Sequence, residues 1–291
     1  MNILVTGANG QLGNALRDIA PNYPQCNFVF TDIQELDITN EQAINQMVND
    51  EQIDIIINCA AYTAVDKAES DQQLAHLLNA EAPALLAKAI ASRGGDIIHI
   101  STDYVFDGKG HTPYTEDMPT CPQSVYGTTK LAGEQGVEAA NPHHIIIRTA
   151  WLYSPYGNNF VKTMLRLGRE RDMLNVVYDQ VGTPTYAPDL ARAIMAAATQ
   201  SEKTYGIYHF SNEGAISWYD FTKAIHRVAG ITTCQVNPIR SAAYPAPAPR
   251  PSFSVLDKAK IKETLGITVP YWEDSLKECI SILLNAENTT A

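Results

Sequence analysis

A tyrosine and a lysine four residues apart, Tyr126 and Lys130, form the pair in this sequence that is best suited to proton transfer. Four residues are about one turn of a helix, so the two side chains would lie on one face. A neighbouring ammonium stabilises the ionised form of a phenol, and such a pair could act as a general acid in reducing a ketone or as a base in oxidising an alcohol. Tyr219 and Lys223 have the same spacing without a cofactor-binding pattern before them, so the spacing alone does not identify a site.

A glycine-rich segment, Thr6-Gly7-Ala-Asn-Gly10-Gln-Leu-Gly13, follows a strand-like run and precedes a helical pattern. A dinucleotide-binding loop requires this context, because glycines let the backbone approach a pyrophosphate and a helix N-terminus offers free N–H groups. The spacing is GxxGxxG rather than GxGxxG, and a glycine-rich turn without a ligand is the alternative interpretation. The predicted cofactor contacts in this loop are Gly7, Gly10, Gln11, Leu12 and Gly13.

Asp32 ends the second strand-like run, 19 residues after Gly13, where an acidic residue can hold the adenosine ribose. An ordinary carboxylate in a turn at a strand end is the alternative. A carboxylate repels a 2′-phosphate, and no Arg or Lys follows directly, so these residues favour NADH over NADPH. Asp37 and Ile38 could lie beside the adenine, although Asp37 could equally belong to the N-cap region of a helix that starts at Glu41.

Two later strand-like runs end in residues that could face a cofactor and a substrate. Ala60, Ala61 and Tyr62 follow the third run, and small side chains there would let a cofactor pass close to the backbone. Tight strand packing would explain the same residues. Thr102 ends the next run, and its hydroxyl could donate a hydrogen bond to a substrate carbonyl beside the phenol of Tyr126.

Strand-like and helical segments alternate through the first half of the chain. Continuous runs of β-branched residues suit strands buried on both faces of a parallel sheet, and the alternation predicts right-handed crossovers and a doubly wound, Rossmann-type α/β fold. The predicted strands are Ile3–Thr6, Phe28–Thr31, Ile53–Asn58, Ile97–Ser101 and Ile145–Thr149, and the predicted helices are Leu12–Ala20, Glu41–Asn49, Ala82–Ser92 and Val125–Ala139.

After Ala150 the sequence becomes rich in turns and proline. Within this part of the chain, an apolar helix at Ala187–Thr199 and a strand-like run at Ile207–Phe210 are expected to pack with the sheet and helices of the first 150 residues. A second, smaller domain would then be interleaved with the first. We expect a dinucleotide-binding domain made of residues 1–150 and 187–212, and a substrate-binding domain made of residues 151–186 and 213–291.

The composition is that of a soluble globular protein, with 45% hydrophobic and 18% charged residues among 291. A net charge of -11 disfavours nonspecific binding to nucleic acid or anionic membranes. The sequence lacks a run of about 18 apolar residues, so no membrane-spanning helix is expected. The five cysteines are scattered without the spacing of metal ligands, and the N-terminus has no pattern of a signal peptide. A reduced, cytoplasmic protein without a metal site is therefore expected.

The glycine loop, the strand-end Ser-Thr and the Tyr-x-x-x-Lys pattern together resemble the extended short-chain dehydrogenase/reductase superfamily. Longer segments resemble one of its families, the dTDP-4-dehydrorhamnose reductases, and they occur in the family's order from residue 3 to about 260. The segments that carry this resemblance are Asn58–Glu69, Ile100–Gly108, Val125–Glu134, Arg148–Tyr153, Gly157–Phe160, Asp179–Thr185 and Arg250–Pro251.

The resemblance implies reduction of the C4 ketone of dTDP-4-dehydro-L-rhamnose, the last step of dTDP-L-rhamnose synthesis. Tyr126 would be the proton donor, Lys130 would bind the nicotinamide ribose and lower the pKa of the phenol, and Thr102 would bind the substrate near the reacting oxygen. Further substrate contacts would be Asp103, Asn159, Trp151 and Arg250. The alternative for Trp151 is an aromatic residue of the core, and the alternative for Arg250 is a solvated arginine in a loop.

The family commonly accepts both NADPH and NADH, so either cofactor is expected. Some members dimerise through magnesium held by carboxylates, one of them from the first helix after the glycine loop. Here that region reads Asn14-Ala15-Leu16, without a carboxylate, so a monomer or a different homodimer is expected. Another enzyme of the extended group, such as a nucleotide-sugar epimerase, and a non-enzymatic regulatory subunit are the rival functions. The presence of both Tyr126 and Lys130 disfavours the regulatory subunit.

Overall fold

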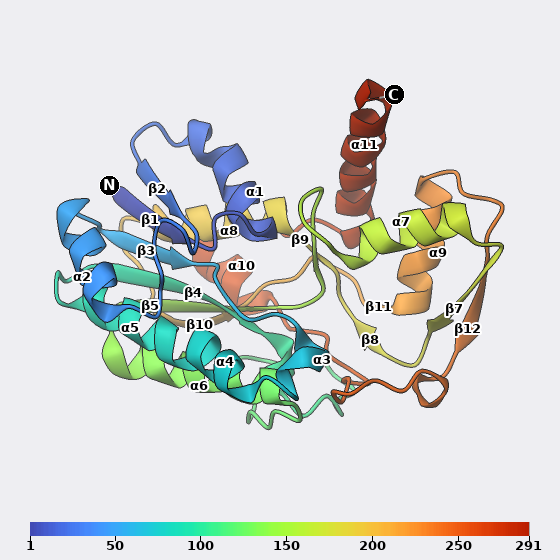
Figure 1. The fold of residues 1–291 in the computed structure, drawn as a ribbon, viewed down its shortest axis with the longest axis horizontal. Helices are drawn as coiled ribbons and strands as arrows, with labels where there is room; N and C mark the ends of the chain where they lie inside the picture. Colours follow the sequence, from blue (N-terminus) through green and yellow to red (C-terminus); the bar gives the residue numbers. More distant parts are fainter. Residues whose placement is uncertain (291) are drawn as a thin grey trace.

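The computed structural model describes residues 1–290 as two lobes that differ in size (Figure 1). A parallel six-stranded sheet forms the centre of the larger lobe, with the strand order β10-β5-β4-β3-β1-β2. Because β1 lies between β2 and β3, the direction of winding reverses between β1 and β3, and the predicted doubly wound α/β fold is confirmed. The strands are β1 (Asn2–Thr6), β2 (Asn27–Thr31), β3 (Ile55–Asn58), β4 (Asp96–Thr102), β5 (His144–Thr149) and β10 (Gly206–His209).

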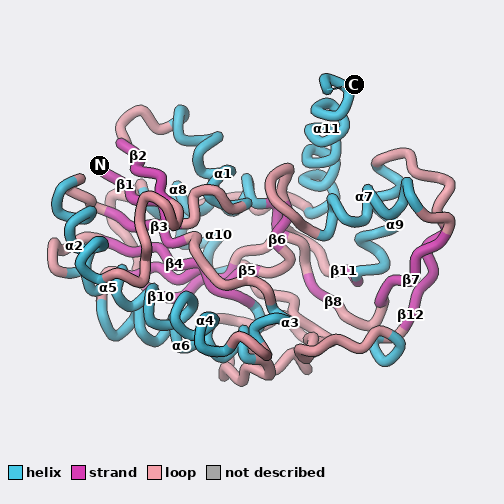
Figure 2. The backbone as a smooth tube through the Cα atoms, in the orientation of Figure 1, coloured by secondary structure: helices cyan, strands magenta, loops and turns pink. Residues whose placement is uncertain are grey.

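Helices cover both faces of this sheet (Figure 2). Leu16 of α1 and Leu190 of α8 belong to one buried apolar cluster with the sheet residue Ile57. Ile44 of α2 and Leu86 of α5 belong to the cluster on the other face. The first face carries α1 (Gln11–Ile19), α8 (Ala187–Ala198) and α10 (Ala259–Leu265), and the second carries α2 (Glu41–Asp50), α5 (Ala82–Ala91) and α6 (Val125–Ala140).

The carboxyl ends of the strands carry polar residues that lie side by side. Thr6 of β1 pairs in register with Thr31 of β2 and Asn58 of β3, and Thr102 of β4 pairs with Thr149 of β5. In open α/β sheets, ligands bind beyond this edge, at the point where the winding reverses. The fold therefore assembles the glycine loop and the candidate catalytic residues along one edge.

The predicted elements of the sheet and its helices agree with the structure to within a few residues. β3 begins at Ile55 rather than Ile53, because the N–H of Ile53 still bonds to Val48 O in the turn after α2. Short helical segments that were not predicted lie between the strands: η1 (Ala20–Asn22), α3 (Val65–Ala68), α4 (Gln72–His76), the π-helical turn η2 (Leu77–Glu81) and η3 (Asp103–Val105).

The smaller lobe packs around aromatic side chains, with Phe221, Trp272 and Tyr153 in one buried cluster. Its helix α9 starts with a capping box in which Ser217 and Asp220 satisfy each other's backbone N–H groups. The helices of this lobe are α7 (Phe160–Glu170), α9 (Trp218–Val228) and α11 (Trp272–Thr290), with η4 (Ser241–Ala243). Its strands form three pairs: β7 (Met173–Val177) with β12 (Gln235–Ile239), β8 (Val181–Gly182) with β11 (Ile216–Ser217), and β6 (Leu152–Tyr153) with β9 (Thr185–Tyr186).

The chain crosses between the lobes more than once. β10 is a strand of the main sheet, and α8 packs against α1. In addition, Ile261 and Val269 are buried in the core of the larger lobe, although the sequence assigned residues 213–291 to the second domain. We therefore propose that the dinucleotide-binding domain also includes the segment around α10. None of the helices within residues 1–290 is long and apolar enough to cross a membrane.

Candidate active site

The glycine loop fits tightly against the neighbouring strand end. Gly7 has a φ of 64°, and a Cβ at this position would lie 2.7 Å from the backbone nitrogen of Ala60. A Cβ on Gly13 would lie 2.5 Å from Ala8 Cα. α1 begins at Gln11 after Gly10, without a hydrogen bond from a side-chain cap. A helix start without a side-chain cap, held in a closely packed loop, is suited to binding phosphate through its N–H groups.

Asp32 lies at the end of β2 and faces this loop. Its carboxylate accepts hydrogen bonds from the N–H groups of Asn9, at 3.0 Å, and Ile33, at 2.8 Å. Asp37 is exposed, and hydrogen bonds from Thr39 lower the pKa of its carboxyl group. Asn40, rather than Asp37, caps α2, and the side chain of Ile38 is buried in the core. Asp32 is thus positioned beside the loop, while Ile38 can contact a ligand only through its backbone.

An asparagine that the sequence analysis did not single out holds the segment after β3. Asn79 is fully buried in the π-helical turn η2, and its side chain binds the N–H of Tyr62 at 2.8 Å and the C=O of Tyr62 at 3.0 Å. Tyr62 in turn donates to Asp71. This clamp sets the path of Ala60 and Ala61, which follow β3 at the edge where the winding reverses. π-helical turns occur often at functional sites, but the sequence carries no local signal for one here.

Tyr126 lies in the first turn of α6, one turn before Lys130. Ser124 caps this helix by accepting the N–H of Gly127 at 3.1 Å. Burial raises the pKa of the Tyr126 phenol above its usual value, while a hydrogen bond with Thr102 opposes that rise and the charge of Asp103 adds to it. The sequence predicted instead that Lys130 lowers this pKa. Burial is the largest influence on this pKa and acts in the opposite direction, and the predicted effect of Lys130 stays a prediction.

Lys130 is turned toward the sheet. Its Nζ donates to the carbonyl oxygen of Ile100 at 2.6 Å and lies 3.5 Å from His99 Nε2. Burial lowers the pKa of Lys130 to about 8, while the charge of Glu134 opposes the shift. The lysine is therefore held against β4 by its hydrogen bond to Ile100, one helical turn after the candidate acid.

Thr102 and Asp103 adjoin Tyr126 at the end of β4. The Thr102 hydroxyl donates to Asp103 Oδ1 at 2.9 Å and accepts the N–H of Tyr104 at 3.2 Å. Burial raises the pKa of Asp103 to about 6, although Ser254 and Thr102 act to lower it. Ser254 acts on the pKa of Asp103, but neither Asp103 Oδ2 nor Ser254 Oγ has a hydrogen-bond partner. This carboxyl group is thus held near the acid with one oxygen unpaired.

A cavity of about 450 Å³ lies between the lobes and is lined mostly by apolar side chains, both aliphatic and aromatic. Trp151, which has a φ of 48°, stacks on Trp218 with ring centres 3.4 Å apart. Tyr104 lines the cavity, and its ring meets that of Tyr126 edge-on with centroids 5.4 Å apart. Tyr126 therefore contacts the wall of the cavity through Tyr104, and Trp151 both packs on Trp218 and lines the cavity.

Arg250 lines the same cavity and is held by two groups. Its Nη2 pairs with Asp66 Oδ2 at 2.7 Å, and its Nη1 donates to the Tyr104 hydroxyl at 3.2 Å. Pockets of this kind, with apolar walls and a few polar groups, are typical ligand sites. Arg250 is thus a cation in a mainly apolar cavity, rather than a solvated loop residue.

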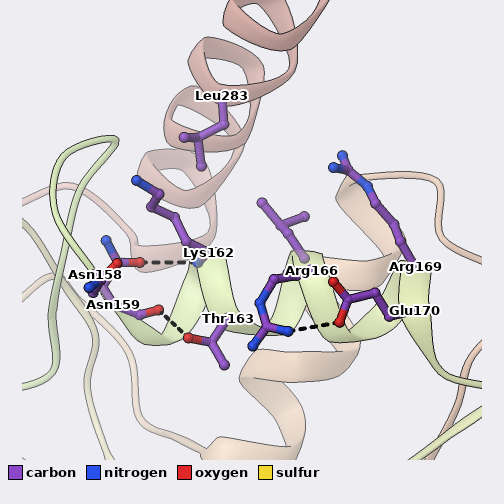
Figure 3. Close-up of a pocket in the computed structure, with 9 residues that line it drawn as sticks. Asn158, Asn159, Lys162, Thr163, Arg166, Arg169, Glu170 and Leu283 are labelled. Carbon is purple, nitrogen blue, oxygen red and sulfur yellow. Dashed lines mark hydrogen bonds and ion pairs between the residues drawn. The ribbon is translucent and has the colours of Figure 1, made fainter.

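Asn159 does not line this cavity. It caps α7 by accepting the N–H of Lys162, and its Nδ2 donates to Gln11 Oε1 at 2.9 Å and Ser154 O at 2.8 Å. Figure 3 shows it at the start of α7 beside a separate groove of about 680 Å³, where Arg166 pairs with Glu170. In this structure Asn159 joins Gln11 of the glycine loop to the second lobe, and its role in substrate binding stays a prediction.

A buried ion pair supports α6 and was also missed. Arg148 of β5 binds Glu134 through two hydrogen bonds of 2.9 and 2.7 Å, and Ser101 of β4 donates to the same carboxylate. Glu134 follows Tyr126 and Lys130 at intervals of four residues, which is the only signal in the sequence that could have indicated a shared face. Among residues 1–290, no group of three or more His, Cys, Asp or Glu is placed to hold a metal ion.

The fold and this edge together define an enzyme of the extended short-chain dehydrogenase/reductase class. A family model described as the RmlD substrate binding domain matches residues 1–285. A dTDP-4-dehydrorhamnose reductase from Sinorhizobium fredii is 43% identical over 292 residues, covering 98% of each chain. The chain belongs to the dTDP-4-dehydrorhamnose reductase family.

Solved structures agree with this placement. A crystal structure of a dTDP-4-dehydrorhamnose reductase from Clostridium acetobutylicum is 48% identical, with a TM-score of 0.94 and coverage of 98% of this chain and 100% of that chain. A dTDP-4-dehydrorhamnose reductase from Bacillus anthracis in complex with NADP is 40% identical, with a TM-score of 0.92 and coverage of 97% and 99%.

Proposed function

We propose that this protein reduces the C4 ketone of dTDP-4-dehydro-L-rhamnose to give dTDP-L-rhamnose, with NADPH or NADH as the hydride source. The observation that carries the proposal is the position of Tyr126: its ring contacts Tyr104 of the cavity wall, and it lies beside Thr102 at the ligand-binding edge of the sheet. Family membership supports the choice of a dTDP-sugar ketone as the substrate.

The residues around the glycine loop fit a dinucleotide. Gly7 and Gly13 let the loop pack closely against the backbone of Ala60 and Ala8, and the uncapped start of α1 can receive the pyrophosphate. Asp32 can receive the hydroxyls of the adenosine ribose, and Lys130 can reach the nicotinamide ribose. When bound, the reduced nicotinamide supplies the hydride. The Asp32 carboxylate favours NADH on electrostatic grounds, whereas the relative from Bacillus anthracis contains NADP, so both cofactors are proposed.

Proton delivery is assigned to Tyr126. Because burial raises the pKa of its phenol, the side chain stays protonated near neutral pH and can donate to the alkoxide that forms at C4. The Thr102 hydroxyl would turn its hydrogen from Asp103 Oδ1 to the same oxygen and polarise it. Their positions at the end of β4 and the start of α6 hold both donors on one side of the reacting carbon, as ketone reduction requires.

The cavity between the lobes would hold the substrate. Trp151 and Trp218 offer flat apolar surfaces for the sugar or the base. Arg250 offers a planar cation that suits a diphosphate, and it would exchange part of its pairing with Asp66 for the phosphate oxygens. Asp103 would contact the sugar from the end of β4, beside Tyr126.

Absorbance at the reduced nicotinamide band tests the function, with purified protein, dTDP-4-dehydro-L-rhamnose, and NADPH or NADH in turn. We expect rapid loss of absorbance and a dTDP-L-rhamnose product. Tyr126→Phe should abolish turnover while dinucleotide binding is retained, and Tyr219→Phe, the matched change in the other Tyr-x-x-x-Lys pair, should leave turnover intact. Binding without turnover in the wild type would contradict the proposal, and retention of NAD through purification would favour an epimerase.

A further inference from the structure

A row of buried polar side chains crosses the sheet beneath the candidate acid. Thr6, Asn58 and His99 are aligned in register on β1, β3 and β4, and all three are buried. Thr6 Oγ1 donates to Asn58 Oδ1 at 2.7 Å, and Asn58 Nδ2 lies 3.0 Å from His99 Nδ1. His99 Nε2 lies 3.5 Å from Lys130 Nζ. The row thus joins the strand before the glycine loop to the lysine.

The orientation of the Asn58 amide is set by a backbone group. The N–H of Ala60 can only donate, and it lies 3.2 Å from Asn58 Oδ1. The amide nitrogen must therefore face His99, and because an amide nitrogen only donates, His99 Nδ1 must accept. An imidazolium carries hydrogens on both ring nitrogens and would direct one of them at the Asn58 amide. His99 is therefore neutral, with its proton on Nε2.

This tautomer directs an N–H group at Lys130. An ammonium has three donors and no acceptor, whereas a neutral amine has a lone pair that can accept. The Ile100 carbonyl takes one hydrogen of Lys130 in either state. We infer that His99, held as its Nε2–H tautomer by Asn58, is a positioning residue that favours loss of a proton from Lys130.

The surroundings of Lys130 agree with this inference. Burial lowers the pKa of Lys130 to about 8 and that of His99 well below its usual value. Glu134 of α6 also acts on Lys130, and its charge raises the pKa of the lysine. Cys59 lies after the end of β3, and burial raises the pKa of its thiol to about 12, so it stays neutral where Lys130 titrates. In the proposed reductase, the alkaline limit of turnover would then depend on His99. Only this last consequence rests on the proposed function.

The tautomer can be measured directly in the full-length protein. In protein with ¹⁵N-labelled histidine, long-range ¹H–¹⁵N correlations distinguish the two ring nitrogens, and His99 can be assigned through its own backbone without a variant. We expect a protonated Nε2 and an unprotonated Nδ1, with no titration of His99 between about pH 5.5 and about pH 9. A proton on Nδ1, or a ring that titrates in this range, would overturn the inference.

Asn58→Asp tests the link to Lys130. A carboxylate accepts rather than donates, so His99 should move its proton to Nδ1 and offer the Nε2 lone pair to an ammonium. The pKa of Lys130, followed through its ¹³Cε shift, should rise by about one unit or more. Asn141→Asp changes another buried asparagine, at the far end of α6, and should leave Lys130 unchanged.

The added carboxylate would favour the ammonium even without a change of tautomer. A higher pKa with the proton of His99 still on Nε2, or a switched tautomer with an unchanged pKa, therefore contradicts the inference. If Asn58→Asp does not fold, the tautomer of His99 in the wild-type protein tests the inference by itself. Neither readout depends on turnover, so failure of the reductase assay and failure of this inference are distinguishable.

Discussion

Replacing Arg148 with methionine tests whether the buried ion pair beneath α6 stabilises the protein through charge. Arg148 and Glu134 have side chains that are 3% and 1% exposed, and two hydrogen bonds join them. In Arg148→Met the Glu134 carboxylate keeps only the Ser101 hydroxyl as a partner. A buried charge that has lost its counter-ion costs about 3–5 kcal/mol.

That cost converts into a measurable shift in melting temperature. An unfolding entropy of about 2.1 cal/mol/K per residue gives about 0.6 kcal/mol/K for a chain of 291 residues. The midpoint should therefore fall by about 5–8 °C. The stranded carboxylate can reduce the penalty by binding a proton, so the loss should be smaller at about pH 5 than at about pH 8.

Calorimetry or thermal circular dichroism at both pH values measures the loss. The double variant Arg148→Met/Glu134→Gln removes both charges and should recover most of the stability, because a buried pair contributes little beyond a well-packed neutral pair. A loss that is the same at both pH values, together with a double variant that is as unstable as the sum of the single variants, would refute the charge argument. The side chain of Arg148 would then matter for its packing on Phe106.

Three further changes test the site itself. In Gly13→Ala the new Cβ meets Ala8, and a backbone shift costing about 1–3 kcal/mol should raise the Kd for NADPH about five- to hundredfold in a fluorescence titration; an unchanged Kd would contradict the tight fit. Burial raises the pKa of Asp103 to about 6, so the contribution of Asp103 to wild-type stability should fall as pH rises from about 4 to about 6. Asp103→Asn should recover at most about 3 kcal/mol above that range and nothing below it in urea unfolding, and a difference independent of pH would refute this. Arg250→Lys loses the planar contact with Asp66 and Tyr104 and should raise KM about tenfold with cofactor affinity unchanged; an equal loss of cofactor affinity would place Arg250 elsewhere.

Much of the candidate site was predictable because its signals are local. The glycine loop is recognisable since its backbone conformations and close approaches exclude side chains, as at Gly7. The Tyr126–Lys130 pair is recognisable because helical periodicity places residues four apart on one face. Apolar β-branched runs predicted the parallel sheet, and its topology then brings strand ends such as Thr102 to one edge.

Other parts of the site depend on contacts between segments that are distant in the sequence. Asn79 holds Tyr62 only because a π-helical turn packs behind β3. Asn159 has the residue type of a sugar contact, but its amide is occupied by the helix cap and Gln11. Nothing in the neighbouring residues indicates either partner.

The sequence by itself determined the fold class, the cofactor loop and the identity of the candidate acid, since these follow from periodicity, glycine geometry and residue type. Only the tertiary structure decided the charge states around that acid. The adjacent lysine suggested a lowered pKa for Tyr126, yet burial raises it, and Lys130 turns to Ile100 and His99 instead. The free energy of a charge depends on how much water and which dipoles surround it, and those surroundings come from strands and helices that meet only in the folded chain.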